Sequence, residues 1–271
     1  MYSDKPSPQR LDYLRQRRRR KNSILIFQLL VLIVFFVQWE LTARNGLVDA
    51  FIVSSPSRML ATLQNLWSSG DIWVHLGVSC LETTVGFLLG TVLGTVIAIA
   101  LWWSDYLSKI LEPYLVVLNA LPKTALGPIF IVWMGAGVGS IIAMTLAISI
   151  IVTILNMHVG FLSTDREKIR LMRTFGASKW QILWKLVLPA NYATLFNTLR
   201  VNVGLSWVGV IMGEFLVSKA GLGYLIVYGS QVFNMDLVMT TVILLAAAAV
   251  VMYQCVLWIE KILKKHLGVV E

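Results

Sequence analysis

The sequence predicts an all-α membrane protein with about six transmembrane helices and with both termini in the cytoplasm. Hydrophobic residues occupy 57% of the 271 positions and charged residues only 14%, a balance that a water-exposed globular surface does not accommodate. Several apolar runs reach the ~20 residues needed to cross a hydrocarbon core roughly 30 Å thick, and in lipid such runs must be helical to satisfy their own backbone. Basic residues are the third observation, because they gather at the ends of alternate runs.

Six apolar runs are interpreted as membrane spans. They cover approximately residues 23–43, 76–102, 112–134, 139–161, 194–217 and 237–260. The third run contains Pro122 and Pro128, and each proline removes a backbone donor and crowds the preceding turn, so this span is predicted to be kinked or broken. The chain therefore divides into a basic cytoplasmic tail (1–22), a transmembrane domain (23–260) and a cytoplasmic C-terminal tail (261–271).

The distribution of lysine and arginine sets the predicted orientation. With the N-terminus inside, 18 of these residues lie on the cytoplasmic side, 3 lie outside, and Lys123 and Arg200 remain at membrane depth. This asymmetry follows the positive-inside rule. The net charge of +9 is therefore assigned to membrane orientation and to contact with anionic lipid heads, and no nucleic-acid partner is expected.

Residues 163–191 form the largest polar segment on the cytoplasmic side and are predicted to be the main contact surface for soluble partners. Ser178 is followed three residues later by Gln181, which is a capping-box pattern, so a helix is expected to begin at Lys179. One apolar stripe at helical spacing then follows, formed by Trp180, Leu183, Trp184, Val187 and Leu188.

Two interpretations of this cytoplasmic segment remain open. In the first, the second helix rests among the lipid headgroups with Trp180 and Trp184 as anchors. In the second, Gly176 joins a charged helix over residues 165–174 to the apolar one, and the resulting hairpin projects from the membrane and docks into a soluble partner. Pro189 closes the unit in both cases.

Polar residues at membrane depth are candidates for a solute pathway, because burying charge in lipid is costly. Proline-freed carbonyls at a helix break can line a polar cavity, and Lys123 lies at such a break. The candidates are Pro122, Lys123, Pro128, Arg200, Asn202 and Glu214. The alternative is that such groups satisfy one another or reach the headgroups, and for Glu40 and Glu82 this alternative is favoured.

Glycines recur at four-residue intervals in two of the spans. They are Gly86, Gly90 and Gly94 in the second span and Gly209 and Gly213 in the fifth. Such ridges let another helix approach closely, because association in lipid depends on packing. Packing within one subunit and contact between two copies are both consistent with this pattern.

The cytoplasmic segment resembles the EAA loop of permease subunits of binding-protein-dependent ABC importers. Gly176 matches the glycine of that pattern, and after nine residues the stretch 186–189 (Leu-Val-Leu-Pro) matches its close. The Glu-Ala-Ala positions hold Arg170, Leu171 and Met172 instead, which is a departure from the family.

Three further stretches resemble the same family, particularly its taurine, sulfonate and nitrate branch. They are SSP at 54–56, LPKTALGPIFIVWMG at 121–135 and GEFLVSKAGLGYLI at 213–226, and together the resemblance covers about residues 52–230. Where Glu82 stands, the family often carries arginine. A charge pair between Glu82 and Glu214 is therefore not expected, because two carboxylates repel each other.

The resemblance implies the ABC importer permease fold and a non-enzymatic transport subunit in the cytoplasmic membrane of a prokaryote. Two permease copies form the pathway, each inner loop contacts a separate cytoplasmic ATPase, and an external solute-binding protein delivers the solute, a small anion such as a sulfonate or nitrate. The implied coupling residues are Arg170, Arg173, Gly176, Ala177, Ser178, Trp180, Trp184, Leu188 and Pro189. The sequence lacks G-x-x-x-x-G-K-[ST], so ATP and Mg are expected on the ATPase and no cofactor on this chain.

Three other classes of protein are the alternatives. One is a membrane anchor with no transport role, and the proline-broken span with Lys123 argues against it. A secondary transporter usually shows internal repeats and more spans. An integral-membrane enzyme needs a cluster such as H-E-x-x-H, a nucleophile with a base, or paired carboxylates in one cavity, and the sequence shows none of these patterns. Its three histidines and two single cysteines give no metal-ligand spacing.

Overall fold

The computed structural model describes the backbone of residues 8–266 and the side chains of residues 16–265. Every regular element in that range is a helix, which confirms the all-α prediction. Within it, five helices are long and apolar enough to span a membrane: α1 (Pro8–Arg44), α4 (Asp71–Trp103), α7 (Val138–Leu162), α11 (Tyr192–Val217) and α13 (Met235–His266). A bent pair supplies a sixth span, formed by α5 (Asp105–Ala120) together with η1 (Lys123–Leu126) and α6 (Gly127–Met134).

The third span is broken, as its prolines predict. Its two halves meet at 90°, and the break lies at Leu121 and Pro122, both in extended conformation. A residue that precedes proline avoids the helical region, so the chain leaves the helix at this point. Pro128 does not add a second break, because it lies in the first turn of α6, where its missing N–H would have had no partner.

The first half of this span is longer than the sequence analysis predicted. It begins at Asp105 and not near residue 112, because the Ser104 hydroxyl caps it by accepting a hydrogen bond of 3.2 Å from the Leu107 N–H. The helix also continues through Pro113. The apolar pattern alone missed this start, since the first turns of α5 carry polar residues.

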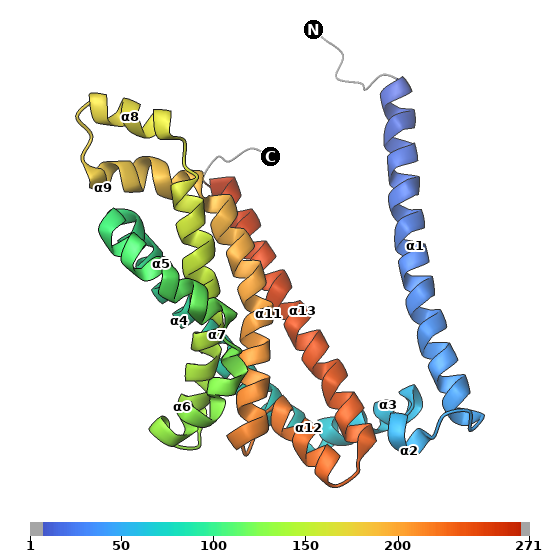
Figure 1. Ribbon diagram of the computed structural model, residues 1–271. Coiled ribbons are helices and arrows are strands. Elements are labelled where there is room, and N and C mark those ends of the chain that lie inside the picture. The colour runs from blue at the N-terminus through green and yellow to red at the C-terminus, as the bar shows by residue number, and fades with distance from the viewer. Residues whose placement is uncertain (1–7, 267–271) are drawn as a thin grey trace.

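The core of the molecule is formed by α4, α7 and α11, which pack against one another, with α13 against α11. Figure 1 shows α1 standing away from this bundle, and its contacts with the rest of the chain run mainly through α2 (Ala50–Val53) and α3 (Pro56–Ser69). Two short elements, α6 and α12 (Leu222–Gln231), lie at one end of the bundle. The helices α3 and α12 belong to the segments that the sequence analysis predicts to lie outside the membrane.

An ion pair ties the segment after α1 to the start of α13. The Arg58 guanidinium lies 2.8 Å from Asp236 Oδ2, and the Ser54 hydroxyl donates a hydrogen bond of 2.7 Å to Asp236 Oδ1. Ser54 is buried, and its backbone has a φ of 60°. The SSP stretch therefore forms a tight corner that fixes α3 against α13.

Glycines let α4 lie directly against α7. A Cβ atom on Gly86 would lie 2.4 Å from Cγ2 of Thr145, and one on Gly90 would lie 2.0 Å from the hydroxyl of Ser149. Gly94 makes the corresponding contact with Thr153. The hydroxyls of these three α7 residues each donate to a backbone carbonyl one turn earlier, so all three are satisfied within their own helix.

The glycines of α11 also contact α7, at Thr145 and at Ile141 one turn earlier. A Cβ atom on Gly209 would lie 2.6 Å from the Cα of Thr145, and one on Gly213 would lie 2.9 Å from Cγ2 of Ile141. Both glycine ridges therefore face a helix of the same chain. Of the two interpretations left open by the sequence, the structure places these residues in packing within one subunit.

Candidate functional site: the cytoplasmic hairpin and the polar core

Residues 163–191 form a helical hairpin that extends sideways from the bundle, at the end opposite α6 and α12 (Figure 1). It comprises α8 (Arg166–Thr174), α9 (Lys179–Ile182), a π-helical turn η2 (Leu183–Val187) and α10 (Leu188–Ala190). The capping box is present as predicted, because Ser178 and Gln181 exchange backbone-to-side-chain hydrogen bonds of 2.8 and 3.3 Å. The predicted helix start at Lys179 is confirmed.

Gly176 turns the chain between the two helices. Its φ is +77°, a left-handed conformation that residues with a Cβ adopt only at a cost. Its N–H donates to the Arg173 carbonyl at 2.9 Å, and the Ala177 N–H donates to the Met172 carbonyl at 3.0 Å, so the end of α8 is closed by the turn.

Replacing Gly176 with alanine is expected to destabilise the hairpin by about 1 kcal/mol, because a Cβ in this conformation approaches the following carbonyl oxygen. Crowding contributes nothing, since no atom lies within 4 Å of the added Cβ position. The measurement is proteolysis of the hairpin in the purified protein, with Gly176→Asn as the control. Asparagine tolerates the left-handed region, so equal cleavage of both variants would contradict the backbone explanation.

The prediction of one apolar stripe along the second helix was wrong. Leu183 and Val187 are 1% and 0% exposed, whereas Trp180 and Trp184 are 57% and 56% exposed. The π-helical turn spaces residues differently from the α-helix on which the prediction rested. The apolar residues therefore occupy two separate faces of the hairpin.

The buried face fixes the hairpin to the inner ends of α4 and α7. Its side chains form a cluster with those helices, made of Ala98, Met157, Phe161, Ile182, Leu183 and Val187. The base of the hairpin is held in addition by Asn191, whose side-chain amide donates to the Thr164 hydroxyl and to the Val187 carbonyl, both at 2.9 Å. A force on the hairpin therefore acts directly on two core helices.

The other face presents aromatic side chains outward. Trp180 lies edge-to-face with Trp184 and with Trp103, at centroid distances of 5.6 and 6.1 Å. The Lys179 ammonium donates to the Trp103 carbonyl and lies 5.4 Å from that ring's centroid, in cation–π range. Phe175, at the hairpin tip, is 81% exposed.

The structure places the predicted coupling residues on one projecting element. Seven of them are exposed: Arg170, Arg173, Gly176, Ser178, Trp180, Trp184 and Pro189. Ala177 and Leu188 are partly buried. Phe175 and Leu171, both exposed, belong to the same surface, and sequence reasoning omitted Phe175 because it matches no position of the family pattern.

The predicted pathway residues do not share one cavity. Pro122, Lys123 and Pro128 lie at the break of the third span, where the Lys123 ammonium donates a hydrogen bond of 2.8 Å to the Asn119 carbonyl. That bond crosses the break and satisfies one carbonyl that the proline has freed. The other three candidates lie elsewhere in the bundle.

Arg200 is part of an ion-pair network at the inner end of the bundle. Its guanidinium binds the Glu260 carboxylate of α13, with Nε at 3.1 Å, and Lys264 binds the same carboxylate at 2.9 Å. Sequence reasoning missed Glu260. The spacing of Glu260 and Lys264 was a visible signal, but the contact with Arg200 crosses 60 positions of the chain.

Asn202 and Glu214 lie at two further levels of α11. The Asn202 side chain is fully buried and donates to the hydroxyls of Thr91 and Thr153, at 3.1 and 2.7 Å, so that it joins α4, α7 and α11. Glu214 lies near the end of α11 that leads to α12, and its carboxylate accepts from the Ser79 hydroxyl of α4. No ion pair recorded for residues 16–265 includes Glu214 or Glu82.

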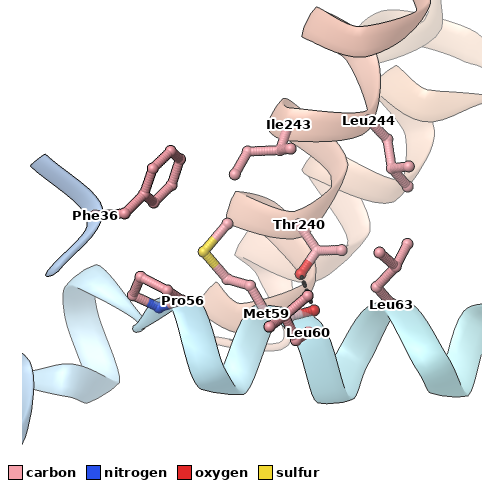
Figure 2. Close-up of a pocket in the computed structure, with 8 residues that line it drawn as sticks. All are labelled: Phe36, Pro56, Met59, Leu60, Leu63, Thr240, Ile243 and Leu244. Atoms are coloured by element: carbon pink, nitrogen blue, oxygen red, sulfur yellow. Dashed lines mark hydrogen bonds between the residues drawn. The ribbon is translucent and has the colours of Figure 1, made fainter. Parts of the chain in front are cut away.

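An apolar hollow of about 350 Å³ lies between α1, α3 and α13 (Figure 2). Its lining residues are Phe36, Pro56, Met59, Leu60, Leu63, Thr240, Ile243 and Leu244. The hydroxyl of Thr240 donates to the Met59 carbonyl and so offers no free donor to a solute. Within residues 16–265, no group of three or more histidine, cysteine or acidic side chains is placed to hold a metal ion.

The bent span, the three-helix core and the projecting hairpin define a helical, multi-pass membrane transport subunit. Residues 90–269 match the family described as binding-protein-dependent transport system inner membrane component, and the chain belongs to this family. A probable ABC transporter permease protein of Haemophilus influenzae is 30% identical, over 87% of this chain and 95% of its own length. A putative aliphatic sulfonates transport permease protein, SsuC of Bacillus subtilis, is 28% identical over 86% of this chain and 84% of its own length.

The fold agrees with solved structures. A chain of a bacterial ABC transporter involved in the import of the acidic polysaccharide alginate superposes with a TM-score of 0.63 and 13% identity, covering 91% of this chain and 98% of that one. The predicted family and the assignment to a multi-pass transport subunit of a prokaryotic membrane are thereby confirmed. The cytoplasmic placement of both termini stays a prediction.

Proposed function

We propose that this importer permease takes its driving force through the hairpin α8–α10, on which a separate cytoplasmic ATPase docks. The observation that carries this proposal is the division of the hairpin into two faces. Leu183 and Val187 are buried against α4 and α7, while Phe175, Trp180 and Trp184 stay exposed. Exposed aromatic side chains on a rigid support are typical of protein interfaces.

The contacts on the buried face explain how docking shifts the transmembrane helices. A partner that binds the hairpin differently in its ATP-bound and ATP-free states changes the relative stability of two arrangements of α4 and α7, because the anchor of the hairpin lies on those helices. A second permease copy completes the pathway in this proposal. ATP and Mg belong to the ATPase, and this chain binds no cofactor.

The docking proposal is tested with the double variant Phe175→Ala/Trp184→Ala. The tagged chain is purified from its host membranes, and the vanadate-sensitive ATP hydrolysis that copurifies is measured per permease. We expect a loss of about tenfold or more with an unchanged melting temperature, because exposed interface aromatics are being truncated. The control is Trp133→Ala, since Trp133 is 75% exposed on α6 at the other end of the bundle.

The alternative interpretation, in which the tryptophans only anchor the hairpin among lipid headgroups, gives a different result. In that case Phe175→Ala/Trp184→Ala leaves the copurified ATP hydrolysis equal to that of Trp133→Ala. Equal activity of the two variants therefore contradicts docking at this face.

We propose a small organic anion such as a sulfonate as the solute, supported by the Bacillus subtilis relative named for aliphatic sulfonates and by the lysine at the break of the third span. The identity of the solute is tested by measuring ligand binding to the solute-binding protein. Its melting temperature is expected to rise with taurine or with an alkanesulfonate, and a rise with only a peptide or a divalent metal ion would contradict the assignment.

A further inference from the structure

Two buried carboxyl groups meet where α4 and α11 approach the first turn of α12. Glu82 of α4 and Glu214 of α11 are each 1% exposed, and Glu82 lies one helical turn after Ser79, whose hydroxyl donates to the Glu214 carboxylate. No ion pair recorded for residues 16–265 includes either of them. This cluster is separate from the hairpin and from the break of the third span.

Glu214 is surrounded by donors. Its carboxylate accepts hydrogen bonds from the Ser79 hydroxyl and from the Gly223 N–H, and the Ser79 oxygen accepts in turn from the Leu222 N–H at 2.7 Å. These amides are the free N–H groups at the start of α12, where a negative charge is favoured. A Cβ on Gly221 would lie 2.3 Å from the Glu214 carboxylate, so only glycine fits at this position.

Glu82 has the opposite environment. Neither of its oxygens has a donor, although both are buried. On α7, Thr145 packs against Gly86, one turn after Glu82 on α4, and the Thr145 hydroxyl already donates to its own helix. A second carboxylate in such a place would be buried close to the charge of Glu214 without a basic side chain paired to it.

The other titratable groups near the pair do not neutralise it. On α4, His75 uses Nδ1 to accept the Gly221 N–H at 3.0 Å, and Cys80 is a free cysteine. On α12, the ring of Tyr224 stacks on the ring of His75, with the centroids 5.8 Å apart. Because no described group donates to Glu82, the geometry leaves that carboxyl group a proton of its own, which it can donate toward Glu214.

We propose that Glu82 and Glu214 form a proton-binding site, in which protonated Glu82 donates a hydrogen bond to the Glu214 carboxylate and thereby ties α4 to α11 and α12. The bond needs no other group: one proton is taken up, and no other bond is made or broken. When the proton leaves, two adjacent carboxylates repel and favour separation of α4 from the other two helices. The packing at the outer end of the bundle therefore depends on pH.

The sign of the pH dependence follows from linkage. The folded protein holds a proton that the unfolded chain releases at neutral pH, so stability is greatest at low pH and falls as the pH rises through the range in which the pair gives up its proton. Glu82→Gln keeps the shape of the side chain and supplies an amide N–H in place of the O–H. It cannot release a proton, so its stability is expected to lack this dependence.

The first measurement is the melting temperature of the purified chain in detergent from about pH 5 to about pH 9, above the range in which free carboxyl groups titrate. We expect a fall in the wild type and a much flatter curve for Glu82→Gln. The control is Glu260→Gln, because Glu260 is also buried but is bound to Arg200 and Lys264. Its curve is expected to keep the slope of the wild type, and equal slopes for Glu82→Gln and the wild type would overturn the proposal.

The second measurement is infrared spectroscopy of the wild type at neutral pH, which stays informative even if a variant fails to fold. A protonated carboxyl group gives a C=O stretch distinct from that of a carboxylate. We expect this band in the wild type and in Glu260→Gln, and its loss in Glu82→Gln. Absence of the band from the wild type would show that both carboxyl groups are ionised and would overturn the proposal.

Discussion

Replacing Gly209 with alanine is expected to destabilise the bundle by up to about 3 kcal/mol, or to prevent folded protein from accumulating. The added Cβ would lie 2.6 Å from the Cα of Thr145 and 3.1 Å from its Cβ. A backbone atom cannot rotate away, so α11 would have to move as a whole from α7. Such a shift would also strain the hydrogen bonds of Asn202, seven residues earlier on the same helix.

Gly204 provides the matched control on the same helix. A Cβ there meets no atom within 4 Å, and alanine favours a helix over glycine by up to about 1 kcal/mol. Gly204→Ala is therefore expected to keep or raise the melting temperature, which is measured in detergent together with the yield of monodisperse protein. Wild-type behaviour of Gly209→Ala would show that α7 and α11 are not packed in the way described.

The features that sequence predicted correctly have local causes. Pro122 breaks its span because its ring excludes the helical conformation at the residue before it. Ser178 and Gln181 start a helix because both partners of the capping box lie within one turn. In each case the interaction that decides the structure involves residues that are adjacent in the chain.

The features that sequence missed depend on contacts between distant residues. Arg200 was predicted to be a charged residue of the solute pathway. In the structure, the packing of α11 on α13 brings Glu260 beside Arg200, and the two form an ion pair. The backbone donors that bind Glu214 and its partner Ser79 come from the start of α12, a different element, so no local pattern in the sequence indicates them. The sequence analysis predicted a single apolar stripe where the hairpin has two apolar faces, because the periodic pattern does not reveal a π-helical turn.

Replacing Leu183 with alanine is expected to separate ATP hydrolysis from transport. Leu183 is 1% exposed and packs in the cluster formed with Met157 and Phe161, so its truncation leaves a cavity that costs about 2–5 kcal/mol. The substitution therefore weakens the packing that joins the hairpin to α4 and α7. The exposed aromatic face that we propose for docking is left unchanged.

The experiment compares Leu183→Ala with Trp184→Ala in vesicles that contain the ATPase and the solute-binding protein. Leu183→Ala is expected to lower the amount of solute transported per ATP hydrolysed, because the hairpin then moves without carrying the core helices. Trp184→Ala, at the neighbouring exposed position, is expected to lower hydrolysis and transport together. If Leu183→Ala lowers only the melting temperature and leaves the ratio of transport to hydrolysis unchanged, the buried face holds the hairpin in place but does not transmit its movement.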